Sequence, residues 1–232
     1  MSIAEKLQTI AENEQKVYDA GKKSEYDAFW DIFQQNGNRT NYSHGFAGLG
    51  WNDETFKPKY DINIIEGERV FTNTRITDLK GILERHNVKL DTSQSYYFSQ
   101  PFMNSTITDS PVLDMRSHVN ISYLLHNAKS LVNVDKVIIK NDGSQTLNYF
   151  ATGCTALKEI RFEGVIGNNI DFKDSPLTKE SITSIINALS PTVSGKTVTF
   201  SNTAVTNAFG SSDSEEWLSL RATKSNWTIS LV

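Results

Sequence analysis

Residues 150–162 read FATGCTALKEIRF, and this stretch contains the pattern on which the fold prediction rests. Its apolar residues occupy relative positions 0, 3, 6 and 8 of a frame that recurs three times upstream, at steps of 23, 24 and 25 along the chain. Positions 0, 6 and 8 are apolar or cysteine in every frame, whereas position 3 is apolar only in the last two. The four frames are Cys154-Leu157-Ile160-Phe162, Leu131-Val134-Val137-Ile139, Ile107-Ser110-Leu113-Met115 and Ile82-Arg85-Val88-Leu90.

Each frame predicts one short strand followed by a return segment. Positions 6 and 8 share one side of the strand because strand side chains alternate, so position 7 points to the other side. A single unit cannot bury its apolar side, and units therefore stack into a parallel sheet. The steps fall within the range that is typical of leucine-rich repeats. We therefore predict an α/β fold, a leucine-rich-repeat solenoid with short parallel strands over residues 79–232, with Cys154 as a small buried hydrophobe.

The steps lengthen toward the C-terminus. Three alternating segments predict strands at Ile170–Phe172, Val198–Phe200 and Ile229–Leu231, and the ends of these strands are separated by steps of 28 and 31. Thr178 is a candidate N-cap for a helix that we place on the back of the solenoid. A second short helix is predicted around Trp217, Leu218 and Leu220. The apolar face of the first helix consists of Ile182, Ile185, Ile186 and Leu189, at helical spacing.

Residues 1–36 predict an N-terminal helical hairpin that precedes the solenoid. Ser2 and Glu5 form a capping-box pattern, and aromatic residues recur at helical spacing in the second helix. Two interpretations fit this segment: a cap over the first repeat, or a homo-oligomerisation device built on a short heptad-like seam. Residues 37–78 are rich in Gly, Asn and aromatics without a regular period, and we interpret them as a linker and N-terminal cap.

Composition and charge limit the classes of molecule that the protein could bind. The net charge of −4 and the lack of a Lys/Arg cluster argue against nucleic acid as a partner. The N-terminus lacks the basic and apolar regions of a signal peptide, and no apolar run is long enough to cross a bilayer. We therefore expect no membrane partner, and a cytoplasmic or phage-particle location. The single cysteine excludes an intramolecular disulfide.

Sequence motifs for catalysis or cofactor binding are missing. The four histidines are scattered and form no zinc-binding pair, and no phosphate loop or nucleophile elbow occurs, so we expect no cofactor, no metal and no enzymatic activity. One catalytic alternative remains open. Asp114 and Glu163 could act as an acid and a base across strands, as the carboxylates of glycan-active enzymes do.

Residues 150–160, FATGCTALKEI, resemble the repeat of bacterial surface-antigen (BspA-type) leucine-rich-repeat proteins, which reads F-x-x-C-x-x-L-x-x-I with one residue fewer between Phe and Cys. The N-terminal run of residues 3–42 and the tail, DFKDSPLTKESITSIINALS at 171–190 with NWTISLV at 226–232, are also similar to repeat proteins of gut Firmicutes and their prophages. The resemblance implies adhesion or protein binding as a function, in a bacterial-surface or phage-tail setting, and implies no established activity.

If the frame is right, outward side chains form columns on a concave sheet, where solenoids usually bind their partners. Alternating charge with an exposed Ile138 suits a protein or glycan ligand. We therefore predict a non-catalytic recognition module, with a structural subunit assembled through residues 1–36 as the alternative. The central column is Lys89, Asp114, Ile138, Arg161, Thr199 and Ser230; the flanking column is Asp91, Arg116, Lys140, Glu163 and Ser201; Lys136 and Glu159 lie on the other side.

Overall fold

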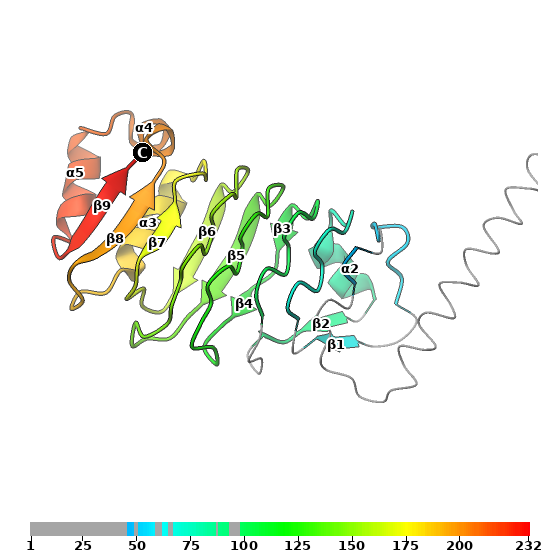
Figure 1. Ribbon diagram of the computed structural model, residues 1–232. Coiled ribbons are helices and arrows are strands. Elements are labelled where there is room, and N and C mark those ends of the chain that lie inside the picture. The colour runs from blue at the N-terminus through cyan, green and yellow to red at the C-terminus, as the bar shows by residue number, and fades with distance from the viewer. Residues whose placement is uncertain (1–45, 49–50, 59–61, 65–66, 87, 93–97) are drawn as a thin grey trace, which may run out of the picture.

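The computed structural model describes residues 46–48, 51–58, 62–64, 67–86, 88–92 and 98–232. The predicted hairpin of residues 1–36 lies outside these residues. Successive segments of the described chain stack along one axis, with the C-terminus at one end (Figure 1). The elements are β1 (Ile62–Ile64), α2 (Leu79–Arg85), β2 (Val88–Leu90), β3 (Asp109–Ser110), β4 (Leu113–Asp114), β5 (Asn133–Ile138), β6 (Glu159–Glu163), β7 (Ile170–Phe172), α3 (Lys179–Ala188), β8 (Lys196–Phe200), α4 (Asn202–Phe209), α5 (Glu215–Ala222) and β9 (Trp227–Leu231).

The prediction of a leucine-rich-repeat solenoid with one continuous parallel sheet is wrong. The fold is α/β, and its short strands form three separate parallel sheets: β1 with β2, β3 and β4 with β5 and β6, and β7 with β8 and β9. The physical reason lies after β6. There the next segment of the same row is helix α3 rather than a strand, so the sheet ends at β6.

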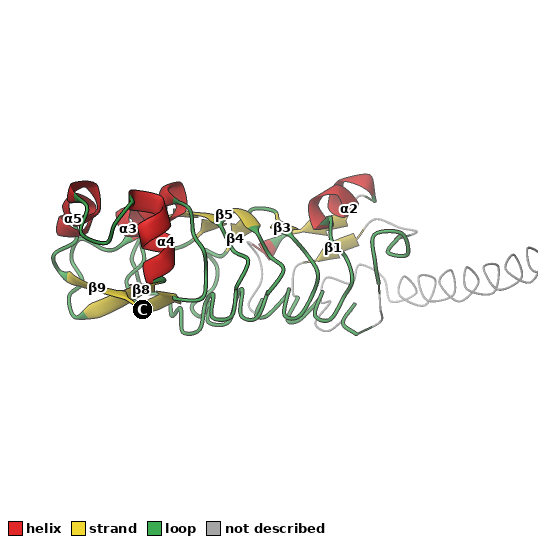
Figure 2. Ribbon diagram, turned by 90° about the horizontal axis from the view of Figure 1, so that it is seen from above, coloured by secondary structure: helices red, strands yellow, loops and turns green. Residues whose placement is uncertain are grey.

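Main-chain hydrogen bonds define one long face, which we call the strand face. It contains α2, β3 to β6, α3 and α5 (Figure 2). Just before β3, β5, β6 and α3, a main-chain N–H donates to the main-chain oxygen of the corresponding residue in the preceding segment. Thr108 donates its N–H to Thr77 O (3.2 Å), Val132 to Thr108 O (2.7 Å), Lys158 to Val132 O (2.9 Å), and Thr178 to Lys158 O (3.0 Å). Helix α3 therefore continues the row that the strands begin.

The opposite long face, which we call the turn face, is toward the viewer in Figure 1. Its first part consists of four tight segments, residues 69–73, 100–104, 123–127 and 149–153, and its second part is the sheet β7–β8–β9 (Figure 2). The four segments also bond to one another in sequence, for example Phe71 N–H to Pro101 O (3.0 Å) and Leu125 N–H to Phe150 O (2.8 Å). Strand β6 is therefore the last strand of the strand face, and the next strand along the chain, β7, lies on the turn face.

The C-terminal strands follow the predicted spacing, but helix α3 lies elsewhere than predicted. Phe172 pairs with Phe200 and Phe200 with Leu231, which confirms the two long steps. Thr178 caps α3 by accepting the N–H of Ser181, as its position indicated. The helix is not on the back of the strands. Ser181 and Ser184 of α3 accept the main-chain N–H groups of Ile160 and Phe162 in β6, so α3 satisfies the edge of that strand.

One hydrophobic core fills the space between the two faces. It extends from Phe46 to Ile229 without a break at the predicted boundary between residues 78 and 79. Aromatic rings stack along it: Phe71 on Phe102 at 6.4 Å, and Phe172 on Phe200 at 6.2 Å. Cys154 lies within this core, as predicted. Among the described residues, no helix is long and apolar enough to cross a membrane.

Candidate functional site

The predicted binding residues of β4, β5 and β6 lie on the strand face, but their columns differ from the prediction. Asp114 pairs with Ile138, as expected. Ile138 then pairs with Glu163 rather than with Arg161, because β5 has an irregularity between Val134 and Val137 that shifts the register. Thr199 and Ser230 belong to β8 and β9 on the turn face, so they cannot extend this column.

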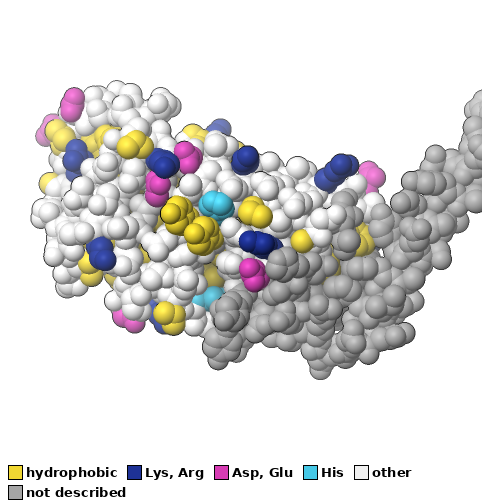
Figure 3. Space-filling model, in the orientation of Figure 1, with side chains coloured by type: hydrophobic (Ala, Val, Ile, Leu, Met, Phe, Trp, Pro, Cys, Tyr) yellow, Lys and Arg dark blue, Asp and Glu magenta, His cyan; other side chains and the backbone are white. Residues whose placement is uncertain are grey.

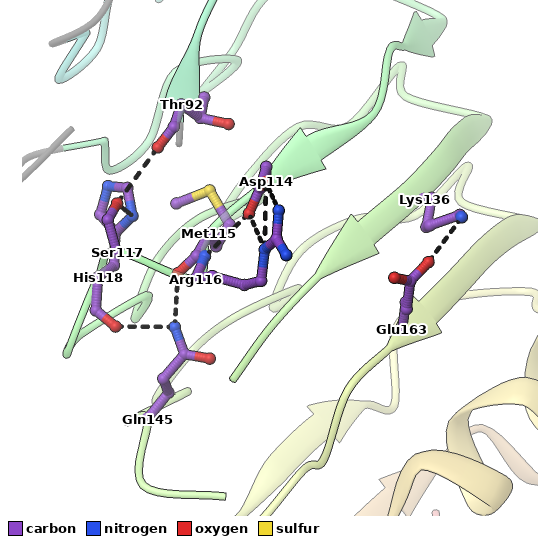
Figure 4. Close-up of polar contacts among 9 residues, drawn as sticks. All are labelled: Thr92, Asp114, Met115, Arg116, Ser117, His118, Lys136, Gln145 and Glu163. Atoms are coloured by element: carbon purple, nitrogen blue, oxygen red, sulfur yellow. Dashed lines mark hydrogen bonds and ion pairs between the residues drawn. The ribbon is translucent and has the colours of Figure 1, made fainter. Parts of the chain in front are cut away.

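Charged side chains on and directly after strands β4, β5 and β6 pair with one another (Figure 4). Arg116 binds the Asp114 carboxylate through two nitrogens, at 2.9 Å and 2.6 Å. Lys136 Nζ lies 2.8 Å from Glu163 Oε2. The hydrogen bond from Arg116 holds the pKa of Asp114 below its ordinary value. Asp114 is therefore a poor general acid, so in the glycan-active alternative it could serve only as the base.

The remaining predicted residues are dispersed. Lys89 is exposed on β2, and Asp91 and Lys140 are half-buried. Glu159 accepts a hydrogen bond from Ser181 Oγ at 3.4 Å. Arg161 is exposed and lines a groove of about 780 Å³ between β6, α3 and α5, in which Lys179 and Glu216 form an ion pair. The structure thus brings together only Asp114, Arg116, Lys136, Ile138 and Glu163.

A buried polar cluster lies directly behind these charges and is structural. Gln145 donates from its amide to the carbonyl oxygens of Met115 (2.7 Å) and His118 (2.9 Å), and it accepts the N–H of Lys140 (2.7 Å). The His118 ring lies next to it, with Nδ1 3.2 Å from Ser117 Oγ (Figure 4). Burial lowers the pKa of His118. The cluster fixes the loop that follows β4.

The turn face carries a feature that sequence reasoning missed, two rows of residues with left-handed backbone. One row is Gly48, Asn73, Asn104, Asn127 and Gly153; the other is Arg69, Gln100, Tyr123 and Tyr149. Glycine and asparagine adopt this conformation easily, which explains the first row. The second row has no such explanation, because long and aromatic side chains are unfavourable there by about 1 kcal/mol each.

The side chains of the second row contact one another along the face. Arg69 Nε donates to Gln100 Oε1 at 2.7 Å. The Tyr123 ring stacks on Tyr149 at 5.0 Å and meets His126 edge-on at 5.4 Å. Tyr149 is 56 % exposed, the most exposed aromatic of the described residues. Figure 3 shows hydrophobic side chains gathered beside a histidine in the middle of this face.

A groove of about 470 Å³ adjoins the exposed tyrosine, between the segment 149–153 and sheet β7–β8–β9. The Thr152 hydroxyl in its lining is buried and has no hydrogen-bond partner among the described residues. Asp171, also in the lining, pairs with Lys173. Within the described chain, no lysine or arginine lines this groove. Its polar residues are Asn148, Thr152, Asn169, Asp171, Thr197 and Thr199.

Metal and thiol chemistry find little support in the part of the chain that the structure describes. No group of three His, Cys, Asp or Glu side chains is placed to hold a metal ion there. Cys154 donates its thiol to Leu125 O at 2.9 Å, and burial raises the pKa of the thiol to about 12. A thiol in this environment does not ionise at neutral pH and is not a nucleophile.

Comparison with known proteins gives no further guide, since no family model, curated protein or solved structure matches this chain. The resemblance to bacterial surface-antigen repeats therefore stays a prediction. The candidate site rests on geometry alone. One recurring sequence pattern could have located the candidate site. Two consecutive buried residues are followed, two positions after the second of them, by Asn or Gly, as in Y-L-L-H-N at 123–127 and Y-F-A-T-G at 149–153.

Proposed function

We propose that the protein is a non-catalytic recognition module that binds an uncharged glycan on its turn face, in the groove beside Tyr149. The observation that carries the proposal is the exposed Tyr149 ring, supported by Tyr123 and held on an unfavourable left-handed backbone. Such strain persists where surrounding structure compensates for it, and it concentrates at functional sites.

The chemistry of the groove favours a sugar over a peptide or an anion. An aromatic face packs well against the C–H face of a pyranose ring, and the hydroxyls of the sugar need hydrogen-bonding partners. Hydroxyl and amide side chains line the groove, including the unpartnered hydroxyl of Thr152. The described lining offers no cation, which disfavours an anionic ligand. An adhesin or phage-particle setting would present this face to a surface glycan.

The test is titration of the full chain with a panel of neutral oligosaccharides, followed by variants. Tyr149→Ala should weaken binding by at least tenfold, the usual cost of losing an aromatic anchor. Tyr149→Phe keeps the stack and should bind nearly as the wild type. Tyr149→Asn should lose binding but keep stability within about 1 kcal/mol, because asparagine tolerates the left-handed backbone.

Arg161→Ala, in the groove of the strand face, is the matched control and should bind as the wild type. Binding that is lost in Arg161→Ala and kept in Tyr149→Ala would move the site to the strand face and overturn the proposal. Failure of every glycan in the panel would also overturn it.

A further inference from the structure

The C-terminal end of the stacked segments exposes an unpaired strand. Strand β9 pairs with β8, and its other edge has no strand partner among the described residues. Helix α5 lies beside it at the same end, so α5 and β9 together form the end face (Figure 2). A hollow of about 340 Å³ lies between them, lined by Leu218, Ala222, Trp227 and Ile229 among others.

The hydrogen bonds at the C-terminus show which main-chain groups point outward. Val232 donates to Phe200 O (3.1 Å) and accepts from Asn202 N–H (2.7 Å), so both its main-chain groups face β8. Alternation along a strand then directs Thr228 and Ser230 to β8 as well. Ile229 and Leu231 direct their N–H and C=O groups to the open edge.

The open edge has none of the usual protection against pairing. Exposed edge strands normally carry a lysine, a proline or another charge that blocks a new partner. Strand β9 reads WTISL and has no charged residue and no proline. In α5, next to this edge, Leu218 is 47 % exposed. Both layers of the end face thus offer groups that a partner would cover.

The charges of α5 select a second copy of this chain as the partner. The helix begins with Glu215 and carries Arg221 in its last turn. Glu216 and Lys224 do not contribute, because Glu216 pairs with Lys179 and Lys224 donates to the carbonyl oxygens of Asn187 and Leu189 in the same chain. A two-fold axis makes the α5 helices of two copies antiparallel, which places the acidic end of each beside the basic end of the other. The same axis makes the two β9 strands antiparallel. A single two-fold axis therefore brings together both the α5 helices and the β9 strands of the two copies.

We propose that two copies associate end to end through antiparallel pairing of β9 with β9, with the two-fold axis at Ser230. In this register Ile229 of each copy pairs with Leu231 of the other, which uses the N–H and C=O groups of both residues in each strand. The two three-stranded sheets join into one sheet of six, and Leu218 is covered by the facing α5. The dimer leaves the groove beside Tyr149 open and does not depend on a glycan.

The test is oxidative cross-linking of a cysteine placed on the axis. Residues 230 of the two copies form a non-hydrogen-bonded pair, with Cα atoms about 4.5 Å apart, within reach of a disulfide. Ser230→Cys should therefore give a cross-linked dimer on a non-reducing gel. Thr228→Cys, on the same side of the same strand, faces residue 232 of the other copy and should not cross-link with itself. The native Cys154 is buried and should not react.

Light scattering on the full chain gives the second measurement. Leu218→Lys should raise the concentration at which the dimer dissociates by at least tenfold, because it buries an ammonium in the interface, whereas Ser219→Lys on the same helix should have a smaller effect. Circular dichroism checks that both variants fold. A monomeric wild-type chain would overturn the proposal. Equal cross-linking of Ser230→Cys and Thr228→Cys, or an oligomer that Leu218→Lys leaves unchanged, would do the same.

Discussion

The central region, residues 98–163, and the C-terminal region, residues 164–232, enclose the same core with opposite arrangements. In the central region, strands β3 to β6 form the strand face and tight left-handed segments form the turn face. In the C-terminal region, helices α3 and α5 continue the strand face, and strands β7 to β9 continue the turn face. The contrast shows that either strands or helices can cover the same core on a given face. The core therefore fixes the distance between the strand face and the turn face, but not the type of element on each.

Residue spacing explains the exchange of elements. Strand β6 has 5 residues and α3 has 10. At about 3.3 Å per strand residue and 1.5 Å per helical residue, both span about 15 Å. A helix therefore needs about twice as many residues for the same distance. The step from Leu113 to its partner Val137 is shorter than the step from Val198 to its partner Ile229, so the C-terminal steps have more residues available for a helix.

The largest expected effect tests whether the core is continuous across the junction of the two regions. Phe172 is fully buried between Phe150 and Phe200, at 6.2 Å from each ring. Phe172→Ala should lower the free energy of unfolding by about 3–5 kcal/mol, the usual cost of a large buried cavity. The loss in the free energy of unfolding is measured by urea denaturation.

Phe102→Ala, in the central region, is the matched variant and should cost a similar amount, because Phe102 is equally buried. A loss below about 1 kcal/mol for Phe172→Ala alone would mean that the junction is poorly packed and that the two regions do not share one core.

A smaller effect concerns the bend that follows β6, where the two regions meet. Gly164 has φ +115°, and a Cβ there would lie 2.3 Å from the main-chain oxygen of Ile139, the residue that follows β5. Gly164→Ala should therefore cost about 2–3 kcal/mol. Gly195→Ala should cost about 1 kcal/mol, because Gly195 also has positive φ but open space around it. Equal losses in thermal unfolding would contradict this account of the bend.

The smallest expected effect is a pH dependence that is larger in the central region than in the C-terminal region. Burial lowers the pKa of His118 below the value of about 6.5 that it has in the unfolded chain. The unfolded state then binds more protons as the pH falls, so the stabilisation is complete above pH about 6.5 and is lost below it. Residues 164–232 contain no histidine. The protection of backbone amides against exchange, after correction for the intrinsic exchange rate, should therefore fall between pH 7 and pH 5 in the central region before it falls in the C-terminal one.

His118→Gln should reduce the slope of stability against pH over the same interval. An unchanged slope in this variant would assign the dependence to other groups, among them His126, whose pKa burial also lowers.

Several local features of the fold were predictable because neighbouring residues decide them. Thr178 followed by apolar residues at helical spacing predicted α3, and alternating apolar residues predicted β7, β8 and β9 with their spacing. The candidate groove was not predictable. Its lining comes from segments around Tyr149, Asp171 and Thr199, and no local pattern states that these segments adjoin.

The sequence by itself determined the positions of α3, α5 and strands β7 to β9 and the burial of their apolar residues, since periodicity and caps act within a few residues. Only the tertiary structure decided on which face each element lies. The exchange of strand for helix after β6 depends on hydroxyls of α3 bonding to the β6 edge, and the tyrosine stack depends on a left-handed backbone that neighbouring segments support. Both are contacts between residues far apart along the chain, and a recurring sequence pattern does not by itself state which segments lie side by side.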